Sequence, residues 1–300
     1  MGMEGAKIKN IVIVILLLLN VFLLFLMGGR RMEDIQSQET ARLRAIQIIQ
    51  DSGVTLDEAA VPREMTLASR HAVRDLEREI GLATALLGGP VTAQARGGEV
   101  YRYYNHAGFV QYHSTGEFTA EFEDGYAPAE QGMEAEHALG ILALLGFDGD
   151  VVEDTVAQGT GTVTVRQKLE QTPVLSCQAS VNYDDGWLVS ITGGRRIFDQ
   201  VEKKVTGESS ITVATALMRV YNGLKDMGDV YNTIEAITPA YIMSVSLSGL
   251  AKLTPVWYVS TDIGAYQLNT QTGQFSRISG FGGAVPMEAE ADSPAAVAGE

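Results

Sequence analysis

A run of apolar residues near the amino terminus constrains this chain more than any other feature of its sequence. The run extends from Ile11 to Met27, is interrupted only by Asn20, and has lysines before it and arginines after it. A helix of this length reaches roughly 25 Å, and about 30 Å once flanking residues snorkel, which is enough to cross a bilayer. The sequence therefore predicts a transmembrane helix at residues 11–29, preceded by a short cytoplasmic segment at 1–10.

A cleavable signal peptide is the competing interpretation of the same run. The apolar stretch is longer than a usual signal-peptide core, and Gly28-Gly29-Arg30-Arg31 follows it without a small-x-small cleavage site, so we expect an uncleaved anchor. A lipoprotein anchor is excluded because no cysteine follows the run. Counted naively, the positive-inside rule does not favour a cytoplasmic amino terminus, because four arginines follow the run and only two lysines precede it.

The charge balance excludes one broad class of function. The chain of 300 residues has 22 basic and 37 acidic side chains, a formal charge of −15, whereas a nucleic-acid-binding surface needs an excess of basic groups. Residues 1–31 carry four basic side chains and one acidic, or +3, so residues 32–300 carry 18 and 36, or −18. Cys177 is the only cysteine, which excludes an intramolecular disulfide framework and a cysteine zinc cluster. We expect an acidic outer domain attached to a basic-flanked anchor, with no nucleic-acid partner.

The residues after the anchor predict helices followed by a β-meander. Apolar side chains at Ile35, Leu43, Ile46 and Ile48 or Ile49 predict an amphipathic helix over 33–51, which we expect to stand as a stalk above the membrane. Further elements are expected as a helix over 67–87 and as strands over 99–104, 108–113 and 116–123, where tyrosine and phenylalanine recur at alternate positions.

The rest of the chain is predicted to repeat one unit, a helix followed by four strands. Both helices contain Ala-Leu, and Thr-Pro-Val is expected to open the third strand of each copy, at 172–174 and 254–256. The predicted fold class is α+β, in which each helix packs across an antiparallel sheet. The predicted divisions are a membrane-proximal part at 32–125, helix-plus-sheet units at 126–205 and 206–279, and a disordered tail at 280–300. In these units, helices are expected over 132–145 and 211–224, and strands over 151–157, 161–170, 173–183, 186–193, 230–238, 240–249, 253–262 and 263–270.

Several of these segments resemble the YycH/YycI family, and YycI most closely. The segments that carry the resemblance are 7–11 leading into 19–24, 167–174, 254–259 and 266–273, and the match covers residues 7–279. Members of this family are bitopic accessory regulators of the WalK (YycG) sensor histidine kinase in Firmicutes, and their outer domain is built from PepSY-like helix-plus-sheet units. The resemblance implies a cytoplasmic amino terminus, with residues 32–300 outside the membrane.

Catalytic constellations are poor in this sequence. Ser69 and His71 are two residues apart on a predicted helix and would point to different sides, and no GxSxG, HExxH or glycine-rich phosphate loop occurs. His106 and His113 could meet across a hairpin and bind a metal, but partly exposed surface histidines are the commoner outcome. Cys177 is expected to be a small buried residue. We therefore expect no enzyme, no cofactor and no metal.

Two features have a sharper functional interpretation. Asn20 lies in the middle of the predicted span, where interhelical hydrogen bonds are worth about 1 kcal/mol, so it is a candidate contact to a partner's helix. Asn20 could equally be tolerated in a strongly apolar helix. Neighbouring candidates for the same contact are Phe22, Leu24 and Phe25, although phenylalanines also face lipid. Trp187 and Trp257 are expected on strands, where core packing is the commoner role.

The sequence predicts a membrane-anchored, non-catalytic regulator at the cell membrane. Its expected partners are the membrane, a WalK/YycG-like sensor histidine kinase and a paralogous YycH-like regulator, as the resemblance implies. The alternative is an extracytoplasmic PepSY-like binding module that acts on a secreted peptidase or a cell-wall component. The two hypotheses make different predictions for a fragment of residues 32–300, because only the alternative predicts that this fragment is active without the anchor.

Overall fold

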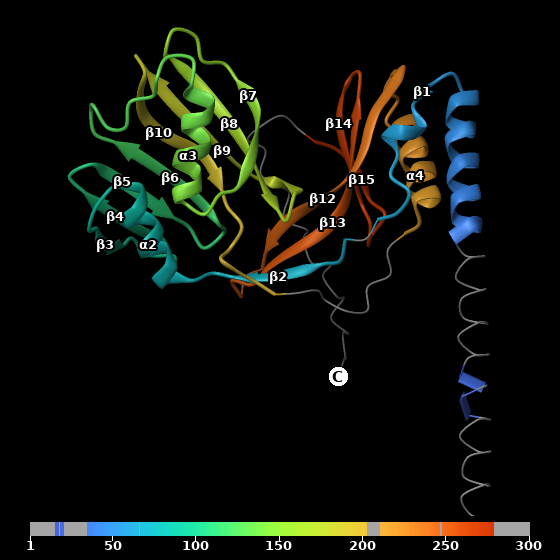
Figure 1. Cartoon of the computed structure of the whole chain (residues 1–300), viewed down its shortest axis with the longest axis horizontal. Coiled ribbons are helices and arrows are strands. Elements are labelled where there is room, and N and C mark those ends of the chain that lie inside the picture. The colour runs from blue at the N-terminus through green and yellow to red at the C-terminus, as the bar shows by residue number, and fades with distance from the viewer. Residues whose placement is uncertain are drawn as a thin grey trace, which may run out of the picture. The chain divides into compact units, whose positions relative to one another are not determined.

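The computed structural model describes residues 16, 17, 19, 20, 35–65, 67–202, 211–246 and 248–278. They form a mixed α+β fold in which strands predominate (Figure 1). The predicted tail at 280–300 lies outside them, as does the predicted transmembrane helix at 11–29 except for Leu16, Leu17, Leu19 and Asn20, which are helical. Over the described stretches, every helix is too short or too polar to cross a membrane.

The described residues group into two units, each assembled from separate stretches of the chain. Unit 1 takes its residues from the stretch up to Ala68, from 211 to Pro239 and from Pro255 to Arg277. Unit 2 takes those from Ser69 to 202, from Ala240 to Thr254 and residue 278. The sequence predicts divisions at 125/126 and 205/206 instead, and the two predicted helix-plus-sheet stretches contribute mainly to unit 2 and to unit 1 respectively.

Unit 2 contains an antiparallel sheet in the order β7-β8-β9-β10-β6-β5-β4-β3. Its helices α2 (Leu76–Leu86) and α3 (Glu134–Leu144) lie on one face, where they share a core with the strands (Figure 1). The bounds of the strands are β3 Thr92–Ala95, β4 Tyr101–Asn105, β5 Gly108–Tyr112, β6 Glu117–Phe122, β7 Gly149–Asp154, β8 Gly161–Leu169, β9 Thr172–Asp184 and β10 Trp187–Arg195.

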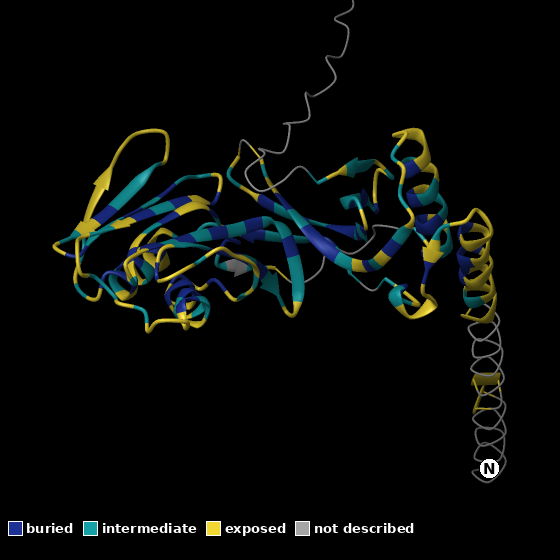
Figure 2. Cartoon of the chain, turned by 90° about the horizontal axis from the view of Figure 1, so that it is seen from above, coloured by how far each residue is buried: buried dark blue, intermediate teal, exposed yellow. Residues whose placement is uncertain are grey.

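Alternating side chains explain why the meander forms as the sequence predicts. In β5, Val110 and Tyr112 are buried in the core, whereas Phe109 and Gln111 lie on the opposite face, because successive side chains of a strand point to opposite sides. Figure 2 shows the same alternation of buried and exposed residues along the other strands of the sheet. The predicted strands at 99–104, 108–113 and 116–123 are therefore confirmed as β4, β5 and β6, while β3 was not predicted.

The predicted helix over 67–87 is correct only in its second half. Residues Arg70–Val73 form the strand β2, which pairs with β11 (Gln200–Val201) and with Ala251–Leu253 of β13. Asp75 then caps α2, since its side chain accepts hydrogen bonds from the backbone N–H groups of Glu77 and Arg78, both at 3.1 Å. Long-range pairing thus overrides the local helical pattern before Asp75.

Unit 1 is built around helix α4 (Val213–Asp226) and a second helix over residues 35–51. Both contribute to one core with β12, β13 and β14. Position 223 of α4 requires glycine, because a Cβ on Gly223 would lie 2.3 Å from the ring of Phe275. The remaining bounds are β1 Thr55–Leu56, the 3₁₀ helix η1 Glu58–Ala60, β12 Thr233–Val245, β13 Ala251–Thr261, β14 Gly264–Asn269 and β15 Phe275–Arg277.

Two prolines lie inside long strands where those strands change partners. The predicted strands at 230–238 and 240–249 are one strand, β12, which pairs with β1 at Thr233–Ile234 and with β9 at Tyr241. Pro239 falls between these positions. Pro255 of β13 likewise falls between the pairing with β2 and the pairing with β14, so Thr-Pro-Val does not open that strand as predicted. Proline has no N–H to donate, so it fits a position that no partner strand engages.

Candidate functional site

The helix over residues 35–51, which follows the apolar run in sequence, is docked against unit 1. Its buried residues are Arg42, Ala45, Ile46 and Ile49, whose spacing places them on one face of the helix. The helix lies beside α4 (Figure 1), and Ala45, Ile46 and Ile49 belong to the same core as α4. The predicted amphipathic helix is confirmed, but it is packed on the rest of unit 1 and does not stand apart from it as a stalk. Among the residues predicted for its apolar face, Ile35, Leu43 and Ile48 are exposed.

A buried arginine fixes this helix to the segment that follows it. The Arg42 side chain is 2% exposed and makes contacts in two directions. Within its own helix, its Nε and Nη2 donate to the two carboxylate oxygens of Glu39, at 3.0 and 2.8 Å. Across to η1, Nη2 donates to Glu58 Oε1 at 2.8 Å and Nη1 donates to the carbonyl oxygen of Val61 at 3.3 Å. We call this set of contacts the Arg42 latch.

The latch has a plain electrostatic consequence. The forked guanidinium matches a carboxylate with two parallel hydrogen bonds, which gives the pair a defined geometry. The hydrogen bond from Arg42 is the main cause that holds the pKa of the Glu39 carboxyl below its usual value, so the pair stays charged. Because η1 directly follows β1, and β1 pairs in parallel with β12, the latch connects the helix over 35–51 with the strands of unit 1.

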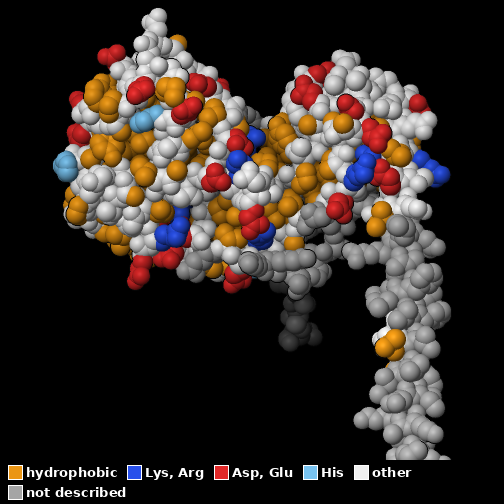
Figure 3. Space-filling view, viewed as in Figure 1, with side chains coloured by type: hydrophobic (Ala, Val, Ile, Leu, Met, Phe, Trp, Pro, Cys, Tyr) orange, Lys and Arg blue, Asp and Glu red, His pale blue; other side chains and the backbone are white. Residues whose placement is uncertain are grey.

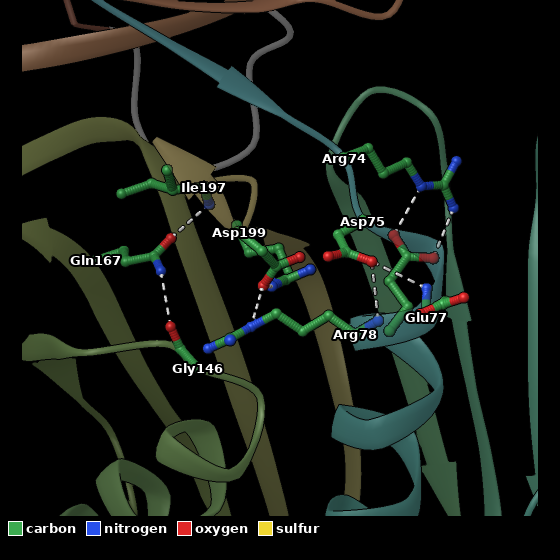
Figure 4. A network of polar contacts seen from close by, with 10 residues as sticks. Arg74, Asp75, Glu77, Arg78, Gly146, Gln167, Ile197 and Asp199 are labelled. Atoms are coloured by element: carbon green, nitrogen blue, oxygen red, sulfur yellow. Dashed lines mark hydrogen bonds and ion pairs between the residues drawn. The ribbon is translucent and has the colours of Figure 1, made fainter. Parts of the chain in front are cut away.

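A second polar network lies in unit 2, at the start of α2 (Figure 4). Arg74 donates two hydrogen bonds to the buried Glu79 carboxylate, at 2.7 and 2.9 Å. Arg78 and Arg196 both pair with Asp199, whose side chain is 4% exposed. Buried charges are stable only when they are paired, so this network holds the segment after β10 in one arrangement against α2. We assign this network a structural role.

Gln167 extends the same network by bridging two backbone groups. Its Nε2 donates to the carbonyl oxygen of Gly146 at 3.4 Å, and its Oε1 accepts from the N–H of Ile197 at 2.7 Å (Figure 4). Both backbone groups lie in loops, where sheet partners do not satisfy them. The side chain therefore replaces ladder hydrogen bonds that the two loops cannot make.

The predicted membrane contact is only in part among the described residues. Asn20 is helical and exposed, and its Nδ2 donates to the carbonyl oxygen of Leu16 at 2.9 Å, one turn back along the helix. This bond uses one of the two amide hydrogens of Asn20. Phe22, Leu24 and Phe25 lie outside the described residues.

The histidines and the serine considered for chemistry are not brought together. Ser69 directly precedes β2 and His71 lies within it, so neither residue is on a helix as predicted. His106 and His113 are at opposite ends of β5, roughly 15–20 Å apart at the rise of a strand, and do not meet. His137 bonds to the hydroxyl of Tyr183, at 2.9 Å from its Nδ1. Over the described part of the chain, no three His, Cys, Asp or Glu side chains are placed to hold a metal ion.

Cys177 and Trp257 are core residues, as predicted, but Trp187 is not. Cys177 is fully buried, and burial raises the pKa of its thiol to about 12, which makes it a poor nucleophile. Trp257 is fully buried in the core of unit 1, whereas Trp187 is 40% exposed on β10. Trp187 directly follows the turn at Asp185-Gly186, where the strand leaves the covered part of the sheet.

Sequence reasoning missed the Arg42 latch, although the signal for it was present. Glu39 and Arg42 have the i, i+3 spacing of a helical ion pair, and Arg42 precedes Ile46 and Ile49 by four and seven residues. An arginine in the apolar stripe of a helix indicates a partner that satisfies its charge. That partner, Glu58, could not be identified from the sequence because it lies beyond a turn and a strand.

Comparison with solved structures gives distant likenesses, among them the two described next. No family model matches the sequence, and no curated protein matches it. An uncharacterized protein from Eubacterium rectale ATCC 33656, solved at 1.45 Å, is 13% identical with a TM-score of 0.47, over 72% of this chain and 87% of that one. The Bacillus megaterium YpeB C-terminal domain is 10% identical with a TM-score of 0.36, over 69% of this chain and 99% of that one. At these values the two likenesses carry no inference about function.

Proposed function

We propose that the chain is a non-catalytic, membrane-tethered regulator of a two-component sensor histidine kinase of the WalK/YycG type. In this proposal residues 11–29 cross the cell membrane once, the amino terminus is cytoplasmic, and the outer domain consists of PepSY-like units in a YycI-like protein. The observation that carries the proposal is the Arg42 latch, because it ties the helix that follows the apolar run to a folded domain. A paralogous YycH-like protein is a further proposed partner.

The latch supports a regulator more than a tethered binding domain for a mechanical reason. A domain that only needs to be held near the membrane requires a flexible linker, whereas residues 35–51 form a helix whose face is buried in unit 1. In this proposal the connection passes a displacement of the outer domain to the anchor, and a displacement of the anchor to the outer domain. A difference in contact energy of typically 1–3 kcal/mol between two kinase conformations is then enough to shift their populations.

Asn20 supports the proposed contact between membrane helices. One amide hydrogen bonds to Leu16 within its own helix, and in this proposal the exposed Asn20 side chain faces the helix of the partner. In a bilayer such a bond is worth about 1 kcal/mol.

The test exchanges the anchor and keeps the rest of the chain. Residues 11–29 are replaced by an unrelated leucine-alanine helix of the same length, and kinase output and co-purification with the kinase are measured in membranes. We expect both to fall to the level of a deletion strain, with Asn20→Leu giving a partial loss and Leu19→Ala serving as the matched control. Wild-type output from the exchanged chain would contradict the proposal and would favour the extracytoplasmic binding module, which needs no particular anchor.

A second arm tests the latch itself. Arg42→Ala removes the contacts to Glu58 and to the carbonyl oxygen of Val61, whereas Arg44→Ala changes an exposed arginine two residues away. Loss of these bonds to a charged group costs about 1.5–3 kcal/mol each in unfavourable cases, so the domain is loosened from the helix without loss of the anchor. We expect Arg42→Ala to retain kinase binding and to lose regulation. If regulation is the same in Arg42→Ala and Arg44→Ala, the latch does not transmit it.

A further inference from the structure

The sheet of unit 2 has a pocket on the face opposite to its helices. Across β4 and β5, Tyr103 lies opposite Val110 and both are buried in the core, while Tyr104 lies opposite Phe109 on the other face. A pocket of about 420 Å³ is formed there. The residues that line it include Gln94, Arg102, Tyr104, Phe109, Glu121, Glu123 and Asp124.

The floor of this pocket already holds a cation. The guanidinium carbon of Arg102 lies 3.4 Å from the centre of the Phe109 ring, a stacked cation–π contact. Phe109 is also directly opposite Glu121 of β6, in a place where the two strands come close. A Cβ on Gly108 would lie 2.1 Å from the carbonyl oxygen of Glu121, so only glycine permits this approach. The ring and the carboxylate are therefore held side by side by the backbone.

The rim of the pocket has more negative charge than its own arginine can balance. Glu121, Glu123 and Asp124 are exposed, and none of the three forms an ion pair with a described residue. With Arg102 as the one cationic side chain lining the pocket, the local balance is 1 − 3 = −2. Among the described residues, no group of three His, Cys, Asp or Glu side chains is placed to hold a metal ion, and this includes the three carboxylates of the rim.

We infer that this pocket binds a lysine or arginine side chain in a basic segment of a partner protein. The partly exposed Phe109 ring and the exposed Tyr104 offer apolar surface beside Arg102 for the stem of such a side chain, and the carboxylates of the rim pair with its charge. The Gln94 amide and the exposed Tyr104 hydroxyl, beside the floor, supply hydrogen-bonding groups for the peptide backbone. This inference is independent of the proposed kinase partner and concerns a different surface.

The charge of the whole outer part favours the same kind of partner. Residues 32–300 carry −18, and Figure 3 shows carboxylates spread over the visible face of both units. A field of this sign raises the rate at which basic segments reach the surface and disfavours acidic ones. The pocket then supplies the local contacts that the general field does not.

The test titrates the full-length protein, in detergent micelles, with the peptide acetyl-(Gly-Lys)₃-amide by calorimetry. A peptide with norleucine in place of each lysine has the same stem without the charge and is expected not to bind. Glu121→Gln and Asp124→Asn should each weaken binding of the lysine peptide about two- to fivefold, as expected for one exposed ion pair. Phe109→Leu should weaken it by a similar factor, because the apolar bulk stays and the ring is lost.

Glu136→Gln is the matched control, since Glu136 is an exposed carboxylate on α3, on the other side of the sheet. It should leave the affinity unchanged. Equal weakening by Glu136→Gln, or unchanged affinity in both Glu121→Gln and Phe109→Leu, would overturn the site. If spermidine binds as tightly as the peptide and displaces it, the occupant is a small polyamine and the peptide assignment fails. Should Phe109→Leu not fold, as judged by its thermal melt, the two carboxylate variants decide alone.

Discussion

At the scale of single residues, the hairpin tips include residue types that do not suit their backbone conformation. Three tips have positive φ at both central residues, as a type I′ turn requires: Gln158-Gly159 at +55° and +80°, Glu170-Gln171 at +49° and +71°, and Asp185-Gly186 at +47° and +78°. Asp-Gly is among the preferred pairs for this turn, whereas Gln158 lacks a short side chain that tolerates the left-handed region. Gly159 cannot change, because a Cβ there would lie 2.7 Å from the backbone nitrogen of Gly186.

We therefore expect Gln158→Asn to stabilise the protein. Asn-Gly is the strongest type I′ pair, and relief of the unfavourable conformation at Gln158 is worth about 0.5–1 kcal/mol. The measurement is the free energy of unfolding in urea, with Gln94→Asn in the exposed strand β3 as the control, which should be neutral or slightly destabilising. A loss of stability in Gln158→Asn would show that the turn is not of this type.

At the scale of elements, the helix over 35–51 offers adjacent isoleucines in opposite environments. Ile49 is fully buried against the core of unit 1, whereas Ile48 is 49% exposed. Truncation of a buried isoleucine to alanine costs about 2–5 kcal/mol, because the transfer free energy of the removed methyl and methylene groups is lost and a cavity is left behind. A free stalk would lose little at either position, so the pair distinguishes a docked helix from an isolated one.

Ile49→Ala should lower the free energy of unfolding of unit 1 by about 2–4 kcal/mol, and Ile48→Ala by less than about 1 kcal/mol. Thermal unfolding of the full chain in micelles, followed by near-ultraviolet circular dichroism of the buried Trp257, reports on this core. Two small and equal effects would show that the helix over 35–51 is not docked in solution.

The elements differ in how far the sequence could predict them. The helices α3 and α4 and the strands β4 to β10 follow from local periodicity and turn residues, because their apolar faces repeat at the period of the element. β2 could not be predicted, since Arg70–Val73 is extended only through pairing with β11 and β13, over 100 residues away. The continuity of β12 through Pro239 was missed for the same reason, because a proline excludes a strand only where a partner needs its N–H.

The candidate site was less predictable than the fold. The Arg42 latch joins Glu58 and Val61 to Arg42 across sixteen and nineteen residues, and nothing local fixes that approach. The pocket on the sheet of unit 2 depends on the register that places Phe109 opposite both Tyr104 and Glu121. A shift of β5 by one residue would turn Phe109 to the covered face, away from Tyr104 and Glu121, so such a site is visible only once the register is known.

At the scale of the whole molecule, buried tyrosines make stability depend on alkaline pH. Burial raises the pKa of Tyr103 to about 12, and burial together with a hydrogen bond to Asp229 raises the pKa of Tyr266 to about 12. Burial also raises the pKa of Tyr112. An unfolded tyrosine has a pKa of about 10. The folded state therefore favours the neutral phenols, and their contribution is complete below pH 10 and is lost as the pH rises from about 10 to 12.

We expect the contribution of these tyrosines to the free energy of unfolding, measured in urea, to stay constant up to about pH 9.5. It should then fall between about pH 10 and 12. Tyr266→Phe keeps the ring stacked on Phe275 and removes the ionisable group, so its stability should fall less over that range. Tyrosinate absorbance recorded alongside should rise together with unfolding. A stability that stays constant to pH 12 would show that the phenols are not buried in solution.

The discontinuous make-up of unit 1 has a consequence for the order in which the chain is made. Helix 35–51 is among the first folded parts to be synthesised, but its partner α4 begins at Val213, more than 160 residues later. At about 5–20 residues per second, roughly 10–30 s pass before α4 exists. During that time Ile46 and Ile49 have no core to enter, whereas the sheet of unit 2 from β3 to β10 is already complete in one continuous stretch. A nascent chain that stops before α4 would thus expose this apolar stripe of the helix over 35–51, and a chaperone would be needed to shield it.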